Sequence, residues 1–272
     1  MLTSPTNALP GPTRDALMLQ AATDSPLWLV GIDDTDNLET RGTGHGARSL
    51  IAAIEQAGLA RGVGVTRHQL LVDDRIPYTS HNSSACLQLS DVADTATLFE
   101  FCRRFMLDLA ARGADVGLCL ASLAQAAGVI AFGRAAKTEV LDQGRARRAA
   151  GEAGIRLEGL TGTRDGIIGS LAGVGLFADG NDGRYLWQRR LRELTDGVAS
   201  VAEIIAATGV DDIRVIDGDS LRDQPDTRIA LGPWPRPVRI DGSSVLLVSQ
   251  GSPHEHADYA CIDKQRLKAF RP

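Results

Sequence analysis

The stretch Trp28–Asp36, WLVGIDDTD, joins an apolar run to three closely spaced carboxylates, Asp33, Asp34 and Asp36. The apolar half predicts a buried strand over 27–33, and the aspartates follow where that strand ends. Carboxylates this close repel one another, and burial makes each of them harder to ionise. Mg²⁺ is the natural partner, because it is a hard ion that takes carboxylates, waters and phosphates. An acidic turn without a ligand is equally open at this point, since Asp and Thr favour turns.

A glycine-rich segment over 41–46, RGTGHG, follows the aspartates and leads into a predicted helix over 47–57. The apolar residues of that helix recur at helical spacing. We expect Gly42, Gly44 and Gly46 to form a loop whose backbone N–H groups, with the helix dipole, cradle phosphate. The segment is neither a Walker A loop nor a GxGxxG motif. Beside the aspartates it favours metal–nucleotide chemistry; alone it would indicate only a tight turn.

A second helix start carries similar signals. The segment 161–166, TGTRDG, opens a predicted helix over 166–177. Asp165 would cap that helix and Arg164 would offset charge on a transferring phosphate, while Gly166 and Gly169 lie at its start. Glycine in a helix interior costs roughly 1 kcal/mol relative to alanine, so these glycines suggest close approach of either another helix or a ligand.

Helical and strand patterns alternate along the rest of the chain and predict an α+β fold, with mixed sheets flanked by helices and a small C-terminal β-meander. In the meander, Asp241-Gly242 is a hairpin turn signal. The predicted helix over 124–150 is interrupted near Gly133. The other predicted strands are 62–72, 84–89, 115–121, 155–160, 213–216, 237–240, 244–249 and 258–262, and the other predicted helices are 95–112 and 198–208.

Composition narrows the function classes. The 272 residues carry 29 Lys+Arg against 34 Asp+Glu, a net charge of -5, which argues against a chain that holds a tRNA backbone by itself. A local basic surface stays open, since 184–192 places several arginines beside Tyr185 and Trp187, which could stack on bases. The four cysteines show no CxxC pairing, so we expect reduced thiols and no zinc ribbon. With no membrane-length apolar run and no secretory signal, we expect a cytoplasmic protein.

Four motifs in one order resemble the N-terminal part of the archaeal agmatidine synthetases that act on an isoleucine tRNA. They are GIDDTD at 31–36, RIPYTSHN at 75–82, TRDGIIGSLAGVG at 163–175 and NDGRYL at 181–186. The resemblance runs from about Trp28 to about Val248 and is weakest between Val92 and Glu158. That family attaches agmatine to a cytidine of the tRNA with ATP. The resemblance therefore implies a kinase-like region that handles ATP and Mg²⁺.

The resemblance also implies roles for individual residues. Asp33, Asp34 and Asp36 match the family's metal-binding aspartates, and Asn82 matches the asparagine that closes its IPWKTRGN-like segment. The helix from Gly166 matches the family's glycine-rich segment on the nucleotide side. His45 stands where the family has a threonine that accepts phosphate. Histidine can accept a phosphoryl group on a ring nitrogen, but a passive phosphate contact or no role at all stays open.

From the residues and the resemblance we predict an ATP- and Mg²⁺-dependent phosphotransferase-like enzyme with an open acceptor. We expect a flexible lead over 1–26, an ATP-handling region over 27–220 that allows two subdomains with a break near 73–92, and a β segment over 221–272. The family's OB-fold and zinc ribbon are not expected here. Two alternatives remain: a non-catalytic nucleotide- or RNA-binding module, and an RNA-modifying enzyme that needs a partner chain to hold RNA.

Overall fold

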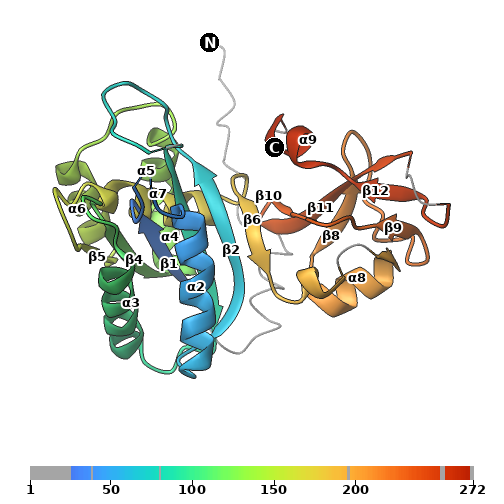
Figure 1. Cartoon of the computed structure of the whole chain (residues 1–272), viewed down its shortest axis with the longest axis horizontal. Helices are drawn as coiled ribbons and strands as arrows, with labels where there is room; N and C mark the ends of the chain where they lie inside the picture. Colours follow the sequence, from blue (N-terminus) through green and yellow to red (C-terminus); the bar gives the residue numbers. More distant parts are fainter. Residues whose placement is uncertain (1–25, 38, 80, 195–196, 252–254, 270–272) are drawn as a thin grey trace, which may run out of the picture.

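The computed structural model describes residues 26–37, 39–79, 81–194, 197–251 and 255–269. Of the predicted lead, residues 1–25 lie outside this described part. Figure 1 shows a larger body, with helices on both faces of a sheet, beside a smaller group of strands. Helices and strands are mixed along the chain, so the predicted α+β class is confirmed.

The larger body is built on six strands that are neighbours in one sheet. They are β1 (Trp28–Asp33), β2 (Arg61–Gln69), β3 (Ser83–Ser90), β4 (Gly117–Ser122), β5 (Arg156–Gly159) and β6 (Arg184–Gln188). Their order is β5-β4-β1-β3-β2-β6, and each neighbouring pair is antiparallel. Strand β1 therefore lies inside the sheet, which explains its apolar sequence and places the aspartates at the end of a central strand.

Helices cover both faces of these strands (Figure 1). Val30 and Ile32 of β1 belong to the apolar cluster under one helix pair, whereas Leu29 belongs to the cluster under the helices of the other face. The pair is α2 (Thr43–Gln56) and α3 (Thr95–Leu109); the other face carries α4 (Leu123–Ala126), η1 (Ala127–Val129), α5 (Ile130–Ala135), α6 (Gln143–Glu152) and α7 (Gly166–Asp179). The alternation along β1 thus fills two separate cores.

Helix α7 approaches the sheet so closely that side chains would not fit between them. A Cβ added to Gly31 would lie 2.1 Å from the backbone oxygen of Ser170, and one added to Gly117 would lie 2.0 Å from that of Gly166. At Gly175 the same test meets the Val129 carbonyl oxygen at 2.4 Å. The close approach expected from the glycines is therefore made by strands β1 and β4 and by η1.

Three predicted boundaries are wrong. Helix α2 begins at Thr43, so Gly44 and Gly46 are helical and the predicted loop over 42–46 does not exist beyond Gly42. Gly133 lies inside α5, and the break in this helical region falls over 136–142 instead. The first residues of the predicted helix over 198–208 form a short strand, after which Ser200 and Glu203 make the capping box that starts the next helix.

The remaining strands form the smaller group in Figure 1. The predicted meander is confirmed, because β11 pairs antiparallel with both β10 and β12. Asp241 and Gly242 have φ values of 48° and 80° at its first turn, as a two-residue hairpin requires. The elements are η2 (Leu191–Leu194), β7 (Val198–Ser200), α8 (Val201–Thr208), β8 (Asp212–Val215), β9 (Arg228–Ala230), β10 (Val238–Ile240), β11 (Ser243–Gln250), β12 (Tyr259–Cys261) and α9 (Lys264–Ala269).

The core of this group draws on both sides of the predicted domain boundary at 220. Val201 and Ile204 of α8 pack in one apolar cluster with Ile229, Leu246 and Val248. β10 also pairs with β6, so the strands continue the sheet of the larger body. The division at 220 stays a prediction. Within the described ranges, no helix has the length and apolar character needed to cross a bilayer.

Candidate functional site

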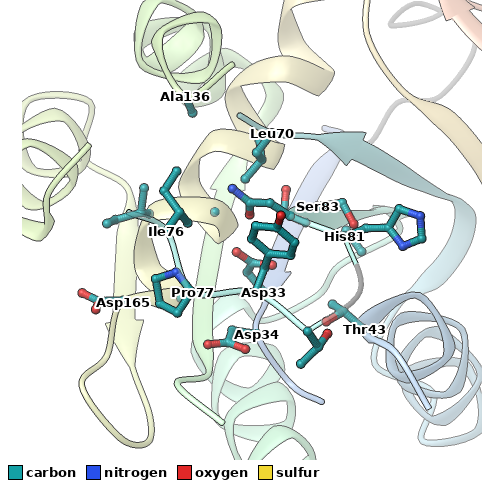
Figure 2. A pocket seen from close by; sticks show the side chains of 18 of the residues that line it. Asp33, Asp34, Thr43, Leu70, Ile76, Pro77, His81, Ser83, Ala136 and Asp165 are labelled. Atoms are coloured by element: carbon teal, nitrogen blue, oxygen red, sulfur yellow. The ribbon is translucent and has the colours of Figure 1, made fainter. Parts of the chain in front are cut away.

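A cavity of about 840 Å³ lies where β1 ends. Its walls come from the end of β1, the first turns of α2 and α7, the chain over 75–85 and the connection over 136–144. In Figure 2, Asp33 and Asp34 occupy the middle of the view, with Asp165 on one side and Thr43 and His81 on the other. Segments that are distant in the sequence therefore meet around the predicted aspartates.

Asp33 ends β1 on the face that packs against α7. A Cβ added to Gly169 would lie 1.7 Å from Asp33 Oδ2, so only glycine fits beside this carboxyl group. Burial, and then the charge of Asp34, raises the pKa of Asp33 to about 8 from its ordinary 3.8. Without a cation, this carboxyl group is therefore mostly protonated at neutral pH.

Asp34 turns the chain out of the strand. Its φ of 52° is left-handed, which Asp tolerates better than most side chains do. Its Oδ2 accepts a hydrogen bond of 3.3 Å from the backbone N–H of Asp115. Burial first, and then the charges of Asp115, Asp36 and Asp165, raise the pKa of Asp34 to about 6. Among the described residues, neither of these two adjacent carboxyl groups forms an ion pair.

Asp36 has a different environment, because its oxygens fasten three segments together. Oδ1 accepts hydrogen bonds from the backbone N–H of Thr43 at 3.0 Å and from its hydroxyl at 2.9 Å. Oδ2 accepts from the hydroxyl of Thr79 at 2.9 Å. Asp36 therefore supplies a carboxylate at the start of α2, where Gly42 has no capping side chain, and ties the chain over 75–85 to it. Its role as a metal ligand stays a prediction.

The residues fit a hard divalent cation through two carboxylates, Asp33 and Asp34. Burial and the neighbouring carboxylates raise their pKa values, and a bound cation would offset both effects. In the part of the chain that the structure describes, no three His, Cys, Asp or Glu side chains gather as a metal-binding group. A Mg²⁺ ion here would complete its coordination with water and substrate phosphate, which is its usual environment in proteins.

His45 lies in the first turn of α2 and lines the cavity. Burial, and then the charges of Arg41 and Arg48, hold its pKa below the ordinary 6.5. The ring is therefore neutral at pH 7, with one nitrogen free of a proton. The predicted phosphate cradle is weaker than expected, because the N–H of Thr43 goes to Asp36 and that of His45 goes to the Gly42 carbonyl at 2.8 Å.

Gly42, Gly44 and Gly46 do not share one role. Gly42 and Gly44 line the cavity, whereas Gly46 does not. Gly46 is buried, and a Cβ added there would lie 2.6 Å from Leu109 Cδ2 of α3. The last glycine of the motif therefore serves helix packing.

The start of α7 contributes three of its four predicted residues. Asp165, Gly166 and Gly169 line the cavity, but Arg164 does not. Arg164 is exposed, with a φ of 71°, and a Cβ added to Gly159 would lie 2.3 Å from its own Cβ. The charge-offsetting role predicted for Arg164 has no support in this geometry.

Asp165 is the N-cap residue of α7, but the predicted cap is wrong because its side chain makes no capping hydrogen bond. Its oxygens instead accept from Gln143 Nε2 at 2.7 Å and from the Thr163 hydroxyl at 2.9 Å. Asp165 therefore joins the start of α7 to α6.

Asn82 lines the cavity and closes the base of the chain that precedes β3. Its Nδ2 donates to the Leu71 carbonyl at 2.6 Å, and its own carbonyl accepts from the backbone N–H of Leu70 at 2.9 Å. These bonds hold the two ends of 71–82 together. The structure thus gives Asn82 a positioning contact at the cavity edge.

Sequence reasoning missed two arginines that line the cavity, Arg48 of α2 and Arg67 of β2. Arg67 Nε donates to the Ser83 hydroxyl at 2.8 Å. Burial, and then the charges of Arg184 and Arg236, lower the pKa of Arg67. The sequence predicts Arg48 in a helix and Arg67 in a strand. It contains no local pattern that shows either side chain facing the aspartates.

The cavity also has an acidic side that sequence reasoning missed, since Glu139 and Asp142 line it together with Asp165. Both belong to the connection between α5 and α6, whose position the predicted break near Gly133 misplaced. The cavity wall is thus acidic toward α6 and α7 and basic toward α2 and β2.

No protein-family model and no curated protein matches the sequence. Among solved structures, the chain is similar to TiaS in complex with its isoleucine tRNA and ATP, with 25% identity and a TM-score of 0.50 over 55% of this chain and 36% of that chain. About half of the chain has a TiaS-like fold. The complex of TiaS with the tRNA, AMPCPP and agmatine follows at 24% and 0.49, covering 55% and 36% of the two chains.

Apo TiaS, described as a tRNA agmatidine synthetase, matches at 23% identity and a TM-score of 0.49, covering 55% of this chain and 35% of that one. Of these three structures the ATP complex alone reaches a TM-score of 0.50, and the likeness in fold rests on it. The match thus spans about a third of the TiaS chain.

Proposed function

We propose that this chain is an ATP-using enzyme that acts on RNA, with ATP bound in the cavity at the end of β1. The observation that carries the proposal is the pair Asp33 and Asp34, two carboxyl groups that have no ion-pair partner among the described residues and share a cavity with Arg48 and Arg67. A metal-bound triphosphate carries both the cation that the carboxylates lack and the anionic oxygens that arginines bind. The TiaS complex of similar fold contains ATP and tRNA.

Asp33 and Asp34 would hold Mg²⁺, which when bound neutralises charge on the phosphate oxygens. Arg48 and Arg67 would contact those oxygens from α2 and β2 and take over the role first predicted for Arg164. Asp36 would keep the start of α2 in place through Thr43. In this arrangement the chain accelerates transfer by positioning and by electrostatic stabilisation.

The apolar part of the wall suits a nucleotide base. Leu70, Ile76, Val140 and Leu141 line the cavity, and Figure 2 shows Ile76 on the same side as Asp165. Ligand cavities are commonly lined by apolar side chains with a few polar groups that fix orientation. We place the base against these residues and the phosphates beside Asp33.

His45 has two possible tasks at this site, and its neutral ring permits both. The unprotonated nitrogen could accept a phosphoryl group, or the N–H could donate a hydrogen bond to a phosphate oxygen. Label from γ-labelled ATP that stays on the protein in alkali, is lost in acid and is absent in His45→Ala would establish the acceptor role. Turnover without such label would exclude the acceptor role.

The test of the proposed function is turnover of γ-labelled ATP with Mg²⁺, with and without short RNAs, in matched variants. Asp34 and Asp91 both follow a strand and have left-handed φ values of 52° and 56°, but Asp91 lies outside the cavity. We expect Asp34→Asn to lose roughly 100-fold or more in turnover, and Asp91→Asn to stay within about twofold.

Full activity of Asp34→Asn would overturn the assignment of this cavity. ATP binding without turnover under every condition would favour the non-catalytic binding module instead. That outcome would keep the cavity as the nucleotide site but remove the enzyme.

A further inference from the structure

A cluster of arginines surrounds one exposed tryptophan beside the cavity. Trp234 precedes β10 and is 57% exposed. The guanidinium carbon of Arg192 lies 4.5 Å from its ring centroid, and that of Arg236 lies 5.4 Å away. The Trp234 side chain therefore presents an aromatic surface to solvent beside two guanidinium groups.

The cluster reaches into the cavity wall. The charges of Arg192, Arg48 and Arg184 act on Arg236, and the charge of Arg192 acts on Arg48, so these side chains lie close together. Arg48 lines the cavity, and Leu186 lines both the cavity and the small pocket whose lining includes Trp234. The tryptophan surface and the candidate ATP site are therefore continuous.

Three arginines on this side of the cavity have no acidic partner within the described part of the chain. Among the described residues, Arg48, Arg67 and Arg236 form no ion pair with a carboxylate, whereas Arg189 nearby pairs with Glu55. Arg236 Nε is buried and has no hydrogen-bond partner in the described part of the chain. Like charges held together with an unused buried donor indicate a surface that an anionic ligand completes.

The surface also corrects the sequence-based expectation about stacking. Tyr185 is only 6% exposed, and Trp187 is partly buried against the core under α2 and α3, so both rings are less exposed than that of Trp234. The exposed ring belongs to Trp234, which lies far from 184–192 in the sequence. Pairing of β10 with β6 brings the two segments together.

We propose that Arg184, Arg192 and Arg236, with Trp234, bind a single-stranded nucleic acid segment and direct it toward the cavity, where Arg48 and Arg67 serve the triphosphate. Arginines would contact the phosphates, and Trp234 would stack on an unpaired base. A duplex fits less well, because its bases are already stacked and cannot reach the ring. The proposal deepens the proposed function, on which it rests for the role of RNA as the substrate, but binding can be measured without any turnover.

The test is fluorescence anisotropy of a labelled single-stranded RNA of about 12 nucleotides, titrated with the full chain between about 50 and 200 mM salt. We expect Trp234→Ala to weaken binding roughly 5- to 100-fold and Trp234→Phe to retain most of the affinity, because phenylalanine also stacks. Arg236→Gln should reduce the slope of log affinity against log salt by about 0.7. The same RNA in a duplex should bind more weakly.

The matched control is Arg156→Gln. Arg156 is an exposed arginine that lies 3.7 Å from the centroid of the Phe99 ring, on β5, and its loss should leave RNA binding unchanged. Labelled ATP provides the second control, since Trp234→Ala and Arg236→Gln should bind it like the unaltered chain. Absence of ATP turnover would count against the proposed function alone and would leave this affinity pattern intact.

Three results would overturn the proposal. Affinity of Trp234→Ala for RNA within about twofold of the unaltered chain would remove the stacking contact. Equal loss of ATP and RNA binding in Arg236→Gln would assign the arginines to the triphosphate. Competition by polyglutamate as strong as by unlabelled RNA would indicate an acidic protein partner.

Discussion

Two clusters of buried ionisable side chains in the larger body have opposite net pKa shifts. At the end of β1, burial and mutual repulsion raise the pKa values of Asp33 and Asp34 to about 8 and about 6. Under α5, burial also raises the pKa of Asp182, but hydrogen bonds and charges from His68 and Lys137 outweigh it, and the net shift is downward. Within the described ranges, the carboxyl groups of the first cluster have no basic partner, whereas Asp182 has two.

Under the proposed function, this difference distinguishes the candidate ligand site from a structural contact. Asp182 Oδ1 lies 2.9 Å from His68 Nδ1, and Oδ2 accepts a hydrogen bond from Lys137 Nζ. His68 Nε2 lies 2.8 Å from the Thr66 hydroxyl, and both of these residues are fully buried. This cluster joins β2, the chain before β6 and the end of α5. Only the Asp33–Asp34 cluster faces the cavity.

The largest expected effect is on turnover. Asp33→Asn should lower Mg²⁺-dependent ATP turnover by roughly 100-fold or more, because the amide cannot supply a charged ligand to the cation. The folded state should not be weakened, since the variant removes a carboxyl group whose ionised form is disfavoured. Turnover of labelled ATP measures the expected loss of activity, and thermal unfolding measures the expected unchanged stability. A lower Tm for Asp33→Asn, with full activity of the folded protein, would mean that Asp33 has a structural role instead.

Substitution of Asp182 should lower stability and leave ATP binding unchanged. Asp182→Ala leaves the buried His68 and the Lys137 ammonium group without their partner, which should lower the free energy of unfolding by roughly 2–4 kcal/mol. For a chain of this size that corresponds to a fall in Tm of roughly 5–10 °C.

ATP affinity of Asp182→Ala, measured well below its Tm, should match that of the unaltered chain. Loss of ATP binding in the folded variant would mean that this cluster belongs to the functional site. Lys137→Met is the milder companion variant, because the Lys137 side chain is 37% exposed.

The raised pKa of Asp33 predicts how stability changes with pH. Between its ordinary pKa of 3.8 and its folded value of about 8, the folded chain holds a proton that the unfolded chain has lost. This group therefore makes the free energy of unfolding fall as pH rises through that range. Asp33→Asn removes the fall, so its Tm relative to the unaltered chain should be higher at pH 8 than at pH 5, by a few degrees. Parallel Tm curves, measured without Mg²⁺ or nucleotide, would contradict the burial of Asp33.

The smallest expected effect concerns the tie between Asp36 and Thr79. Thr79→Val keeps the shape of the side chain but removes the 2.9 Å hydrogen bond to Asp36 Oδ2. We expect a loss of about 1 kcal/mol in stability and a reduction of about fivefold or less in ATP affinity, because the chain over 75–85 loses one anchor at the cavity. Equilibrium binding of ATP measures it. A loss as large as that of Asp33→Asn would mean that Thr79 contacts the nucleotide directly.

Three features could be predicted from local sequence patterns: the aspartates at the end of a strand, the fold class and the terminal meander. Apolar periodicity defines β1, and Asp-Gly defines the turn of the meander. The register of a glycine motif is harder to predict. Gly44 and Gly46 lie in α2 because the Asp36 carboxylate stabilises its first turn, and that contact joins residues seven apart. Because glycine has a low helix propensity, an argument from propensity alone assigns these residues to a loop.

The basic side of the site depended on tertiary contacts. Arg67 faces the cavity because β2 pairs with β3, and Trp234 lies beside Arg192 because β10 pairs with β6. The sequence near these residues contains no pattern that predicts either strand pairing. Arg164 was predicted at the cavity because it precedes α7. Its left-handed backbone instead places its side chain against Gly159.

The most direct test of the account is a count of the protons released when ATP binds. Calorimetric titration at pH 7 in excess Mg²⁺, repeated in buffers of different ionisation enthalpy, measures this number. Because Asp33 has a pKa of about 8 and must ionise to hold the cation, we predict release of about one proton at pH 7, little at pH 9, and none from Asp33→Asn. Binding without proton release at pH 7, or equal release from Asp33→Asn, would contradict the claim that Asp33 and Asp34 form the metal–nucleotide site.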